Sequence, residues 1–407
     1  MTSNRWGMSR EWLVFTVIVV DLIGFGIVIP ILPFMSPALG GDEFDVALVI
    51  ALYSVCAGVA GSYWGALSDR IGRKKVLMIC LTGGAISYIL LVFANELWLV
   101  YVARAMAGVM AGNLPVASAL MADLSRPERR AKAMGLVGTA FGLGLILGPL
   151  LGGLLAGDGQ SFAAAGFFAA AMSLLSVVLA AFLLPPDGPL RSNAVAAPVT
   201  TSSLQFIRHT GSELLLVQYV LHTFAVSAAI YLSPLWLAAL LNWGPREIGI
   251  LFGVVGLAMI IIQGALLNWL TTRFGLINLL GVGAAIFAAS LIIAPLTVGE
   301  YPRAIVVFMA FTGATCVLPV LNTIASTSVP ATECGRMMGL TALAASVGRV
   351  GGPLVIGAVL TIAGYTLAWL LMALPVAVVL IWAMTRDGRY QRFIYSPALD
   401  SELADDL

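Results

Sequence analysis

Long apolar runs, separated by short polar or Pro/Gly-rich connections, constrain this chain more than any other feature. A run of about 20 apolar residues is long enough to cross the hydrocarbon core of a bilayer as a helix. Only 10% of the 407 residues are charged, against about 25% in ordinary soluble domains. We therefore expect an all-α integral membrane protein with twelve transmembrane helices, at residues 12–34, 46–68, 75–94, 97–121, 132–156, 162–184, 213–238, 247–270, 276–297, 302–326, 335–362 and 365–385.

A repeat divides the chain into two copies. Seven residues recur at a constant offset of 204: Met134-Gly135-Leu136, Gly144, Gly148, Pro149 and Gly153 return as Met338-Gly339-Leu340, Gly348, Gly352, Pro353 and Gly357. The offset predicts two pseudo-symmetric six-helix halves, residues 1–184 and 213–385, with a cytoplasmic linker at 185–212 and a disordered cytoplasmic tail at 386–407. Duplicated halves predict a substrate site between them, near the midplane, that opens alternately to each side.

Basic residues collect on one side of the predicted membrane. An even number of spans places both termini on the same side, and the loops of that side contain 17 of the 21 Lys and Arg residues. The loops of the other side contain only Arg246 and Arg303 as bases, together with several acids. The positive-inside rule therefore predicts that both termini are cytoplasmic.

Two charged residues fall inside the first six spans. Asp21 lies about 14 Å along the first span, where an ionised carboxylate is costly unless it is paired or hydrated. We expect it to titrate or to form an ion pair; the alternative is a hydrogen-bond partner between packed helices. Arg104 lies about 10 Å deep in the fourth span and stays protonated. We expect an Asp21/Arg104 pair that opens when Asp21 is protonated, with a permanent structural pair as the alternative.

Arg349 is an arginine where the first copy of the repeat has Leu145. It lies about 20 Å from the cytoplasmic side of its span, and the predicted spans of the second half contain acids only near their ends. Three partners suit a deep arginine: an anionic substrate group, Asp21 across the halves, or water in a cavity.

Uncharged polar residues at membrane depth complete the candidates for the transport pathway. His222 is the only histidine in the predicted spans; it could titrate near neutral pH as a second proton carrier, or serve only as a hydrogen-bonding group. Together with Arg349, the candidates for the substrate cavity are Asn113, Gln218, Gln263 and Asn322. Each of these, taken alone, more often joins helices by a hydrogen bond than contacts a ligand.

Two glycine-containing motifs remain. In the connection between spans two and three, Gly65 and Gly72 permit close backbone approach, and Asp69 can accept hydrogen bonds from helix-end amides or from Arg73. In span five, small residues at every fourth position make a flat packing face and a proline bends the helix. The residues of that face are Gly144, Gly148, Pro149, Gly152 and Gly153.

These motifs together closely resemble the major facilitator superfamily, and within it the twelve-span drug/proton antiporters that include the tetracycline exporters. Residues 65–77 resemble the family's loop signature, 104–108 its span-four arginine motif, 144–153 its antiporter motif, and 21–33 the span-one motif of the drug-export group. The resemblance implies a cytoplasmic gate that holds the halves together when the cavity opens outward, formed by Gly65, Asp69, Arg70, Gly72, Arg73 and Asp123.

The resemblance also implies a function: export of small amphipathic compounds in exchange for protons, by alternating access, in a bacterial-type cytoplasmic (inner) membrane. The proton gradient would supply the energy, with no cofactor, no metal and no nucleic acid, and a monomer would suffice. An exporter or flippase of an anionic amphiphile or lipid-like molecule held by Arg349 is the alternative, and a proton-coupled importer is less favoured. An enzyme is disfavoured because HExxH and GxSxG motifs are missing.

Overall fold

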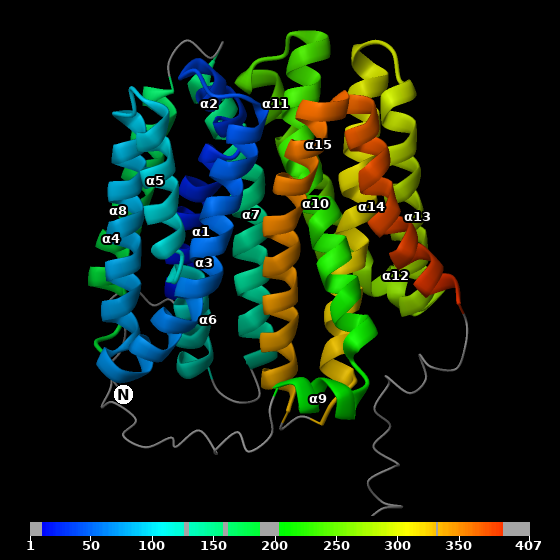
Figure 1. Cartoon of the computed structure of the whole chain (residues 1–407). Coiled ribbons are helices and arrows are strands. Elements are labelled where there is room, and N and C mark those ends of the chain that lie inside the picture. Colours follow the sequence, from blue (N-terminus) through cyan, green and yellow to red (C-terminus); the bar gives the residue numbers. More distant parts are fainter. Residues whose placement is uncertain (1–9, 126–129, 158–161, 188–202, 331–332, 386–407) are drawn as a thin grey trace, which may run out of the picture.

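The computed structural model describes residues 10–125, 130–157, 162–187, 203–330 and 333–385. Within these ranges every regular element is helical, and the long helices run side by side across the molecule (Figure 1). Eleven of these helical segments are long and apolar enough to cross a bilayer. The predicted linker at 188–202 and the predicted tail at 386–407 lie outside the described residues.

The helices follow the order expected for two sets of spans. The first set comprises α1 (Arg10–Val28), α2 (Leu32–Ala38), α3 (Glu43–Ile71), α4 (Arg73–Val92), α5 (Leu97–Val109), α6 (Asn113–Leu124), α7 (Arg130–Ala156) and α8 (Ala163–Leu183). After the short α9 (Ser203–Thr210), the second comprises α10 (Glu213–Leu241), α11 (Pro245–Ile260), the π-helix η2 (Ile261–Leu266), α12 (Leu267–Phe274), α13 (Leu276–Ile293), the 3-10 turn η3 (Ala294–Leu296), α14 (Glu300–Thr327) and α15 (Cys334–Met384).

The last helix contains two spans. α15 is 51 residues long, and its backbone leaves the helical conformation at Gly364, where φ is 75° and ψ is −179°. A positive φ is a conformation that glycine adopts without steric cost, so the chain folds back there, as the orange and red parts of α15 show in Figure 1. With this division the predicted count of twelve spans is confirmed.

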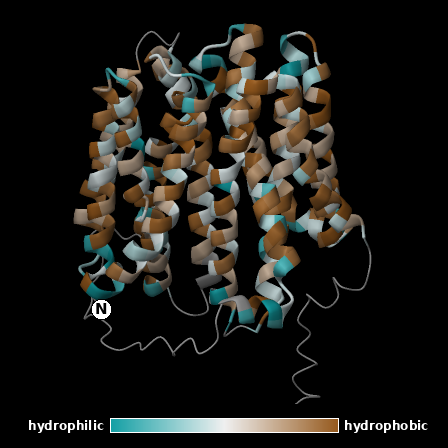
Figure 2. Cartoon of the chain, in the orientation of Figure 1, coloured by the Kyte–Doolittle hydropathy of each residue, from teal (hydrophilic) through white to brown (hydrophobic). Residues whose placement is uncertain are grey.

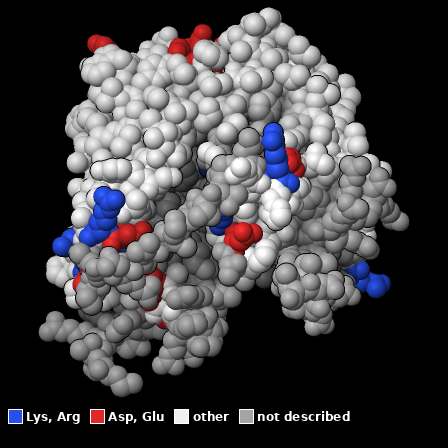
Figure 3. All heavy atoms as spheres, turned by 60° about the horizontal axis from the view of Figure 1, so that its bottom comes forward, with Lys and Arg blue, Asp and Glu red and all other residues white. Residues whose placement is uncertain are grey.

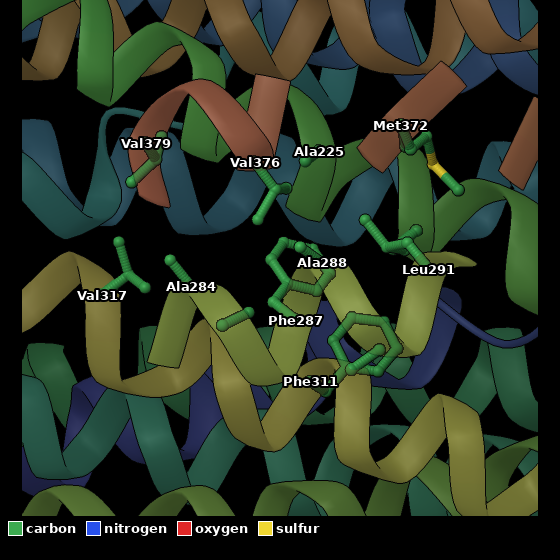
Figure 4. Close-up of a cluster of buried hydrophobic side chains, with 14 of the residues drawn as sticks. Ala225, Ala284, Phe287, Ala288, Leu291, Phe311, Val317, Met372, Val376 and Val379 are labelled. Atoms are coloured by element: carbon green, nitrogen blue, oxygen red, sulfur yellow. The ribbon is translucent and has the colours of Figure 1, made fainter. Parts of the chain in front are cut away.

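Apolar side chains occupy both the outer surface and the interior of the bundle. Hydrophobic residues cover the middle of the helices, and hydrophilic ones gather toward their ends (Figure 2). Inside the second half, Phe287 of α13 is fully buried in a cluster with Ala225 of α10, Val317 of α14 and Val376 of α15 (Figure 4). In a membrane such interiors are held by close packing rather than by exclusion from water.

The repeated glycines pack equivalent helices in the two halves. A Cβ on Gly26 of α1 would lie 2.9 Å from the Cα atom of Gly148 on α7, so neither position has room for a side chain. In the second half, a Cβ on Gly352 of α15 would collide with the carbonyl oxygen of Phe224 on α10. The repeat read from the sequence therefore marks one packing arrangement used twice.

The two halves touch at one face of the molecule. We call the face with α9 and the start of α1 the linker face, at the bottom of Figure 1, and the face with α2 and the start of α11 the opposite face. Toward the opposite face, a Cβ on Gly153 of α7 would lie 2.8 Å from the Cα atom of Gly249 on α11. The Tyr231 hydroxyl of α10 donates a 2.7 Å hydrogen bond to the Glu43 carbonyl of α3. Both contacts join the two halves.

Toward the linker face the same helices are apart. A Cβ added to any of seven glycines on α3, α7, η2 and α15 would meet no atom within 4 Å: Gly61, Gly65, Gly135, Gly138, Gly264, Gly335 and Gly339. Figure 3 shows the molecule hollowed between the halves on this side. The structure is therefore closed at the opposite face and open at the linker face.

Candidate functional site

Asp21 lies inside the first half and has only neutral hydrogen-bond partners. Its side chain is 6% exposed, and its carboxylate accepts a hydrogen bond from the side-chain amide of Asn113 on α6. The Ser173 hydroxyl of α8 lies 3.4 Å from the same carboxylate and 2.9 Å from the carbonyl oxygen of Leu81. A hydroxyl has one proton, so Ser173 donates mainly to Leu81, and the firm partner of Asp21 is Asn113.

A break in the fourth span aims Asn113 at Asp21. α5 ends at Val109 and α6 begins at Asn113, because Pro115 has no N–H to continue the helix. The carbonyl of Val109, the last residue of α5, accepts a 2.5 Å hydrogen bond from the indole of Trp64 on α3. We predicted an unbroken span and placed Asn113 in the substrate cavity; the structure instead places it in the interior of the first half.

A cavity adjoins Asp21 between α1, α4 and α6. It is lined by Asp21, Asn113 and apolar side chains that include Leu77, Leu81 and Leu114. Its volume of about 10 Å³ is close to what one water molecule needs. A proton acceptor in this position is therefore buried but has room for one hydrating molecule.

Arg104 turns away from Asp21. Its guanidinium lies over the ring of Tyr53 on α3, 4.5 Å from the ring centroid; its side chain is 5% exposed, and its Nε has no hydrogen-bond partner among the described residues. Gly108 allows this, because a Cβ there would lie only 2.5 Å from the Tyr53 carbonyl oxygen, so α5 and α3 approach closely. The expected Asp21/Arg104 ion pair is therefore not formed in this structure.

Arg349 also lacks an acidic partner in the described part of the chain. Its Nη2 donates a 2.8 Å hydrogen bond to the Ser346 hydroxyl, one turn earlier on α15. The side chain is exposed at a depth that the sequence placed within the membrane, which fits a group lining the space between the halves. It forms no ion pair with Asp21 in this structure.

The remaining polar candidates do not converge on one place. His222 of α10 is buried inside the second half, with its ring 6.3 Å from that of Phe287. Gln218, one turn earlier, is buried with its Oε1 unpartnered among the described residues. Asn322 accepts a 2.7 Å hydrogen bond from Tyr219 and so joins α14 to α10. Gln263 is exposed on η2.

Three of the four charged residues of the predicted gate form one cluster at the linker face, and Arg70 is exposed outside it. Arg73 of α4 lies 2.6 Å from Asp69 of α3 and 3.1 Å from Asp123 of α6, and it donates a 2.7 Å hydrogen bond to Ser68. All of these groups belong to the first half. In this structure the cluster therefore joins three helices of one half, and the two halves are not held together by it.

The loop of the gate is fixed by a residue that we did not predict. Gly72 has a φ of 110°, and an added Cβ would collide with the carboxylate of Asp187, which follows α8. Asp187 accepts a 2.8 Å hydrogen bond from the Lys74 backbone N–H, while the Lys74 ammonium donates to the carbonyls of Ala181 and Leu184, at 2.7 Å each. Asp187, which follows α8, caps the start of α4, and Lys74 of α4 caps the end of α8. These two contacts align α4 with α8.

The gate is expected to hold the halves together when the cavity opens outward. We therefore expect the Asp69→Asn variant to slow transport about fivefold, as the loss of about 1 kcal/mol of preference for the outward-open state would do. Its thermal unfolding should change little, because exposed ion pairs contribute about 0–1 kcal/mol to stability. Both quantities are measured on the purified, reconstituted protein. Lys75→Gln removes an exposed charge from the same loop and serves as the control. Normal transport by Asp69→Asn at normal expression would rule out a gating role.

Comparison with known proteins places this arrangement in a family. A family model described as the Major Facilitator Superfamily matches residues 14–263 and 215–396. The class C tetracycline resistance protein of Escherichia coli is 29% identical over 371 residues, which cover 88% of this chain and 91% of that protein. Multidrug resistance protein MdtG of Escherichia coli O9:H4 (strain HS) is 25% identical over 367 residues, covering 86% and 87%.

Solved structures share the fold. The crystal structure of the human organic anion transporter MFSD10 (TETRAN) superposes with a TM-score of 0.70 at 21% identity, covering 92% of this chain and 98% of that one. The helical halves, their repeated glycine faces and the family match agree with one another. This chain belongs to the Major Facilitator Superfamily and is a multi-pass membrane transporter rather than an enzyme.

Proposed function

We propose that this transporter exports small amphipathic organic compounds in exchange for protons, and that Asp21 carries the proton. The observation that supports this most is the isolation of Asp21. Among the described residues it is the only Asp or Glu that lies away from a helix end or a loop, and its partners Asn113 and Ser173 are neutral. A buried carboxylate without a cation binds a proton readily, and tetracycline and multidrug resistance proteins are similar over most of the chain.

The distribution of charge supports an orientation of the structure in the membrane. If the basic linker face is cytoplasmic, the structure is the inward-open state, with the contacts of Gly153 and Tyr231 closing the outer side. Substrate would enter from the cytoplasm or the inner leaflet. A proton bound at Asp21 from the outside would be released to the cytoplasm in this state.

The surroundings of Asp21 suit both protonation states. The Asn113 amide can donate to an ionised carboxylate and can also donate to the carbonyl oxygen of a protonated one. The adjoining cavity leaves room for about one water molecule, which would lower the cost of the ionised form. Neither form requires the surrounding helices to unpack.

Inverted membrane vesicles test this function. With an acid interior, vesicles that contain the protein should accumulate rhodamine 6G, neutral pyrenemethanol or pyrene-1-sulfonate, and an ionophore that collapses the gradient should abolish the uptake. The matched control is vesicles without the protein. Uptake that survives collapse of the gradient, or gradient-dependent uptake of none of the three probes, would overturn the proposal.

A further inference from the structure

Two arginines from different halves lie at similar depth without an acidic partner among the described residues. Arg104 is the eighth residue of α5, about 10 Å from the opposite face. Arg349 is the sixteenth residue of α15, about 22 Å from the linker face, which in a hydrocarbon core of about 30 Å is nearly the same level. Neither side chain forms an ion pair with a residue that the structure describes.

Helix α3 connects the surroundings of the two arginines. The Arg104 guanidinium lies 4.5 Å from the ring centroid of Tyr53 on α3. Arg349 donates a hydrogen bond to the hydroxyl of Ser346 on α15. Ser346 in turn packs on α3, because a Cβ added to Gly58 of α3 would lie 3.7 Å from the Cβ of Ser346. Helix α3 therefore contacts both Arg104 of the first half and Ser346, the hydrogen-bond partner of Arg349, in the second half.

The region around Tyr53 lies between the two halves and can be reached from the linker face only. The halves are packed together toward the opposite face, at Gly153 and Tyr231, and are apart toward the linker face. Phe25 of α1 packs on Tyr53 with ring centroids 5.5 Å apart and adds an apolar wall. Two cations and two aromatic rings are thus grouped around α3 where it contacts the second half.

We propose that Arg104, Tyr53 and Arg349 form the substrate site, and that the exported compound is an anionic amphiphile with a carboxylate, sulfonate or phosphate group. Guanidinium groups bind such oxyanions through paired, charge-assisted hydrogen bonds, and an aromatic wall suits an apolar body. The buried Nε of Arg104, which has no partner among the described residues, is then a donor that the substrate satisfies.

This inference rests on the proposed export function and specifies its substrate. The proton and the anion use different groups, because the Asp21 carboxylate is bound by Asn113 of α6 and Ser173 of α8 and forms no ion pair with Arg104. Exchange then requires that the proton stabilise the outward-open state and the anion the inward-open state. A negative interior potential also favours the exit of an anion.

The test compares three probes with one aromatic body: pyrene-1-sulfonate, pyrenemethanol and pyrenemethylammonium. Binding is measured by tryptophan quenching in nanodiscs of phosphatidylcholine. The wild type should bind the sulfonate most tightly. Arg349→Gln and Arg104→Gln should each weaken sulfonate binding about tenfold or more, with pyrenemethanol changed less than about threefold, and Arg349→Lys should recover part of the loss.

Arg273→Gln, which removes an exposed arginine at the end of α12, is the matched control and should bind as the wild type does. If Arg104→Gln fails to fold, Arg104→Lys and the Arg349 variants still decide the outcome. Equal affinity for sulfonate and ammonium, or an equal loss of all three probes in the arginine variants, would overturn the anion site.

A second arm distinguishes a free organic anion from a lipid headgroup. Dithionite bleaching follows the transfer of fluorescent phosphatidylglycerol and phosphatidylcholine across proteoliposome membranes. Arg349-dependent transfer of phosphatidylglycerol alone would support the anion site with a lipid as its source; sulfonate binding without lipid transfer would support it with a soluble anion. Loss of gradient-driven uptake without loss of sulfonate binding would contradict the proton coupling but leave the anion site standing.

Discussion

The Asp21→Asn variant should lose gradient-driven accumulation of substrate down to the level of empty vesicles, while substrate exchange at equal pH remains within about threefold of the wild type. Asparagine has nearly the same shape and can still accept the hydrogen bond from Asn113, so the first half should remain folded. It cannot bind and release a proton, so the link between the two flows is lost. Parallel measurements of driven uptake and of counterflow separate these effects.

Ser173→Ala is the matched control for Asp21→Asn. It removes the distant 3.4 Å neighbour of the same carboxylate but leaves the titratable group and Asn113 in place. We expect driven uptake by this variant to persist. Unchanged driven uptake by Asp21→Asn would contradict the assignment of Asp21, and equal loss in both variants would indicate a packing defect instead.

The Gly148→Val variant should not yield a folded protein, and Gly148→Ala should unfold at a clearly lower temperature than the wild type. The backbones of α1 and α7 touch at this point: a Cβ on Gly148 would collide with the Cα atom of Gly26 and lie 2.9 Å from the carbonyl oxygen of Ile23. Overpacking of this kind typically costs about 1–3 kcal/mol for a small group, and more for a branched one. Thermal unfolding in detergent, followed by intrinsic fluorescence, measures the effect.

Gly138→Ala on the same helix is the control, because a Cβ there would meet no atom within 4 Å. Its stability should equal that of the wild type or rise by up to about 1 kcal/mol, since alanine favours a helix more than glycine does. Equal unfolding temperatures for Gly148→Ala and Gly138→Ala would show that the glycine face is not a packing contact.

The spans and their repeat could be predicted because both are local properties of the sequence. A run of apolar residues indicates its own span, and the constant offset between the copies identifies equivalent packing faces, as Gly148 and Gly352 show. The positive φ at Gly364, which divides α15, also falls between two predicted spans.

The direction in which a polar side chain points could not be predicted in the same way. Neighbouring residues on a helix point about 100° apart, and the rotation of each helix depends on packing against residues far away in the sequence. Arg104 faces Tyr53 because Gly108 brings α5 onto α3. The glycine and proline near Asn113 could have been interpreted as a helix break, but only the assembled bundle places Asn113 against Asp21.

Three residues went unnoticed in the sequence for different reasons. Ser173 is one of few polar residues in an apolar span and could have been singled out by that alone. Tyr53 carries no such signal, because tyrosine is common in membrane helices; its importance comes from the Arg104 guanidinium that lies over its ring. Asp187 lies beyond the end of α8 and acts on a loop more than a hundred residues earlier.

The most direct test of proton-coupled export is the movement of protons in proteoliposomes that contain a pH-sensitive dye. Adding pyrene-1-sulfonate, pyrenemethanol or rhodamine 6G outside liposomes that contain the wild type should shift the internal pH at once, and Asp21→Asn should abolish the shift while leaving exchange of the same compound intact. Transport of a compound with no accompanying pH change, or an equal pH change in Asp21→Asn, would contradict proton exchange through Asp21.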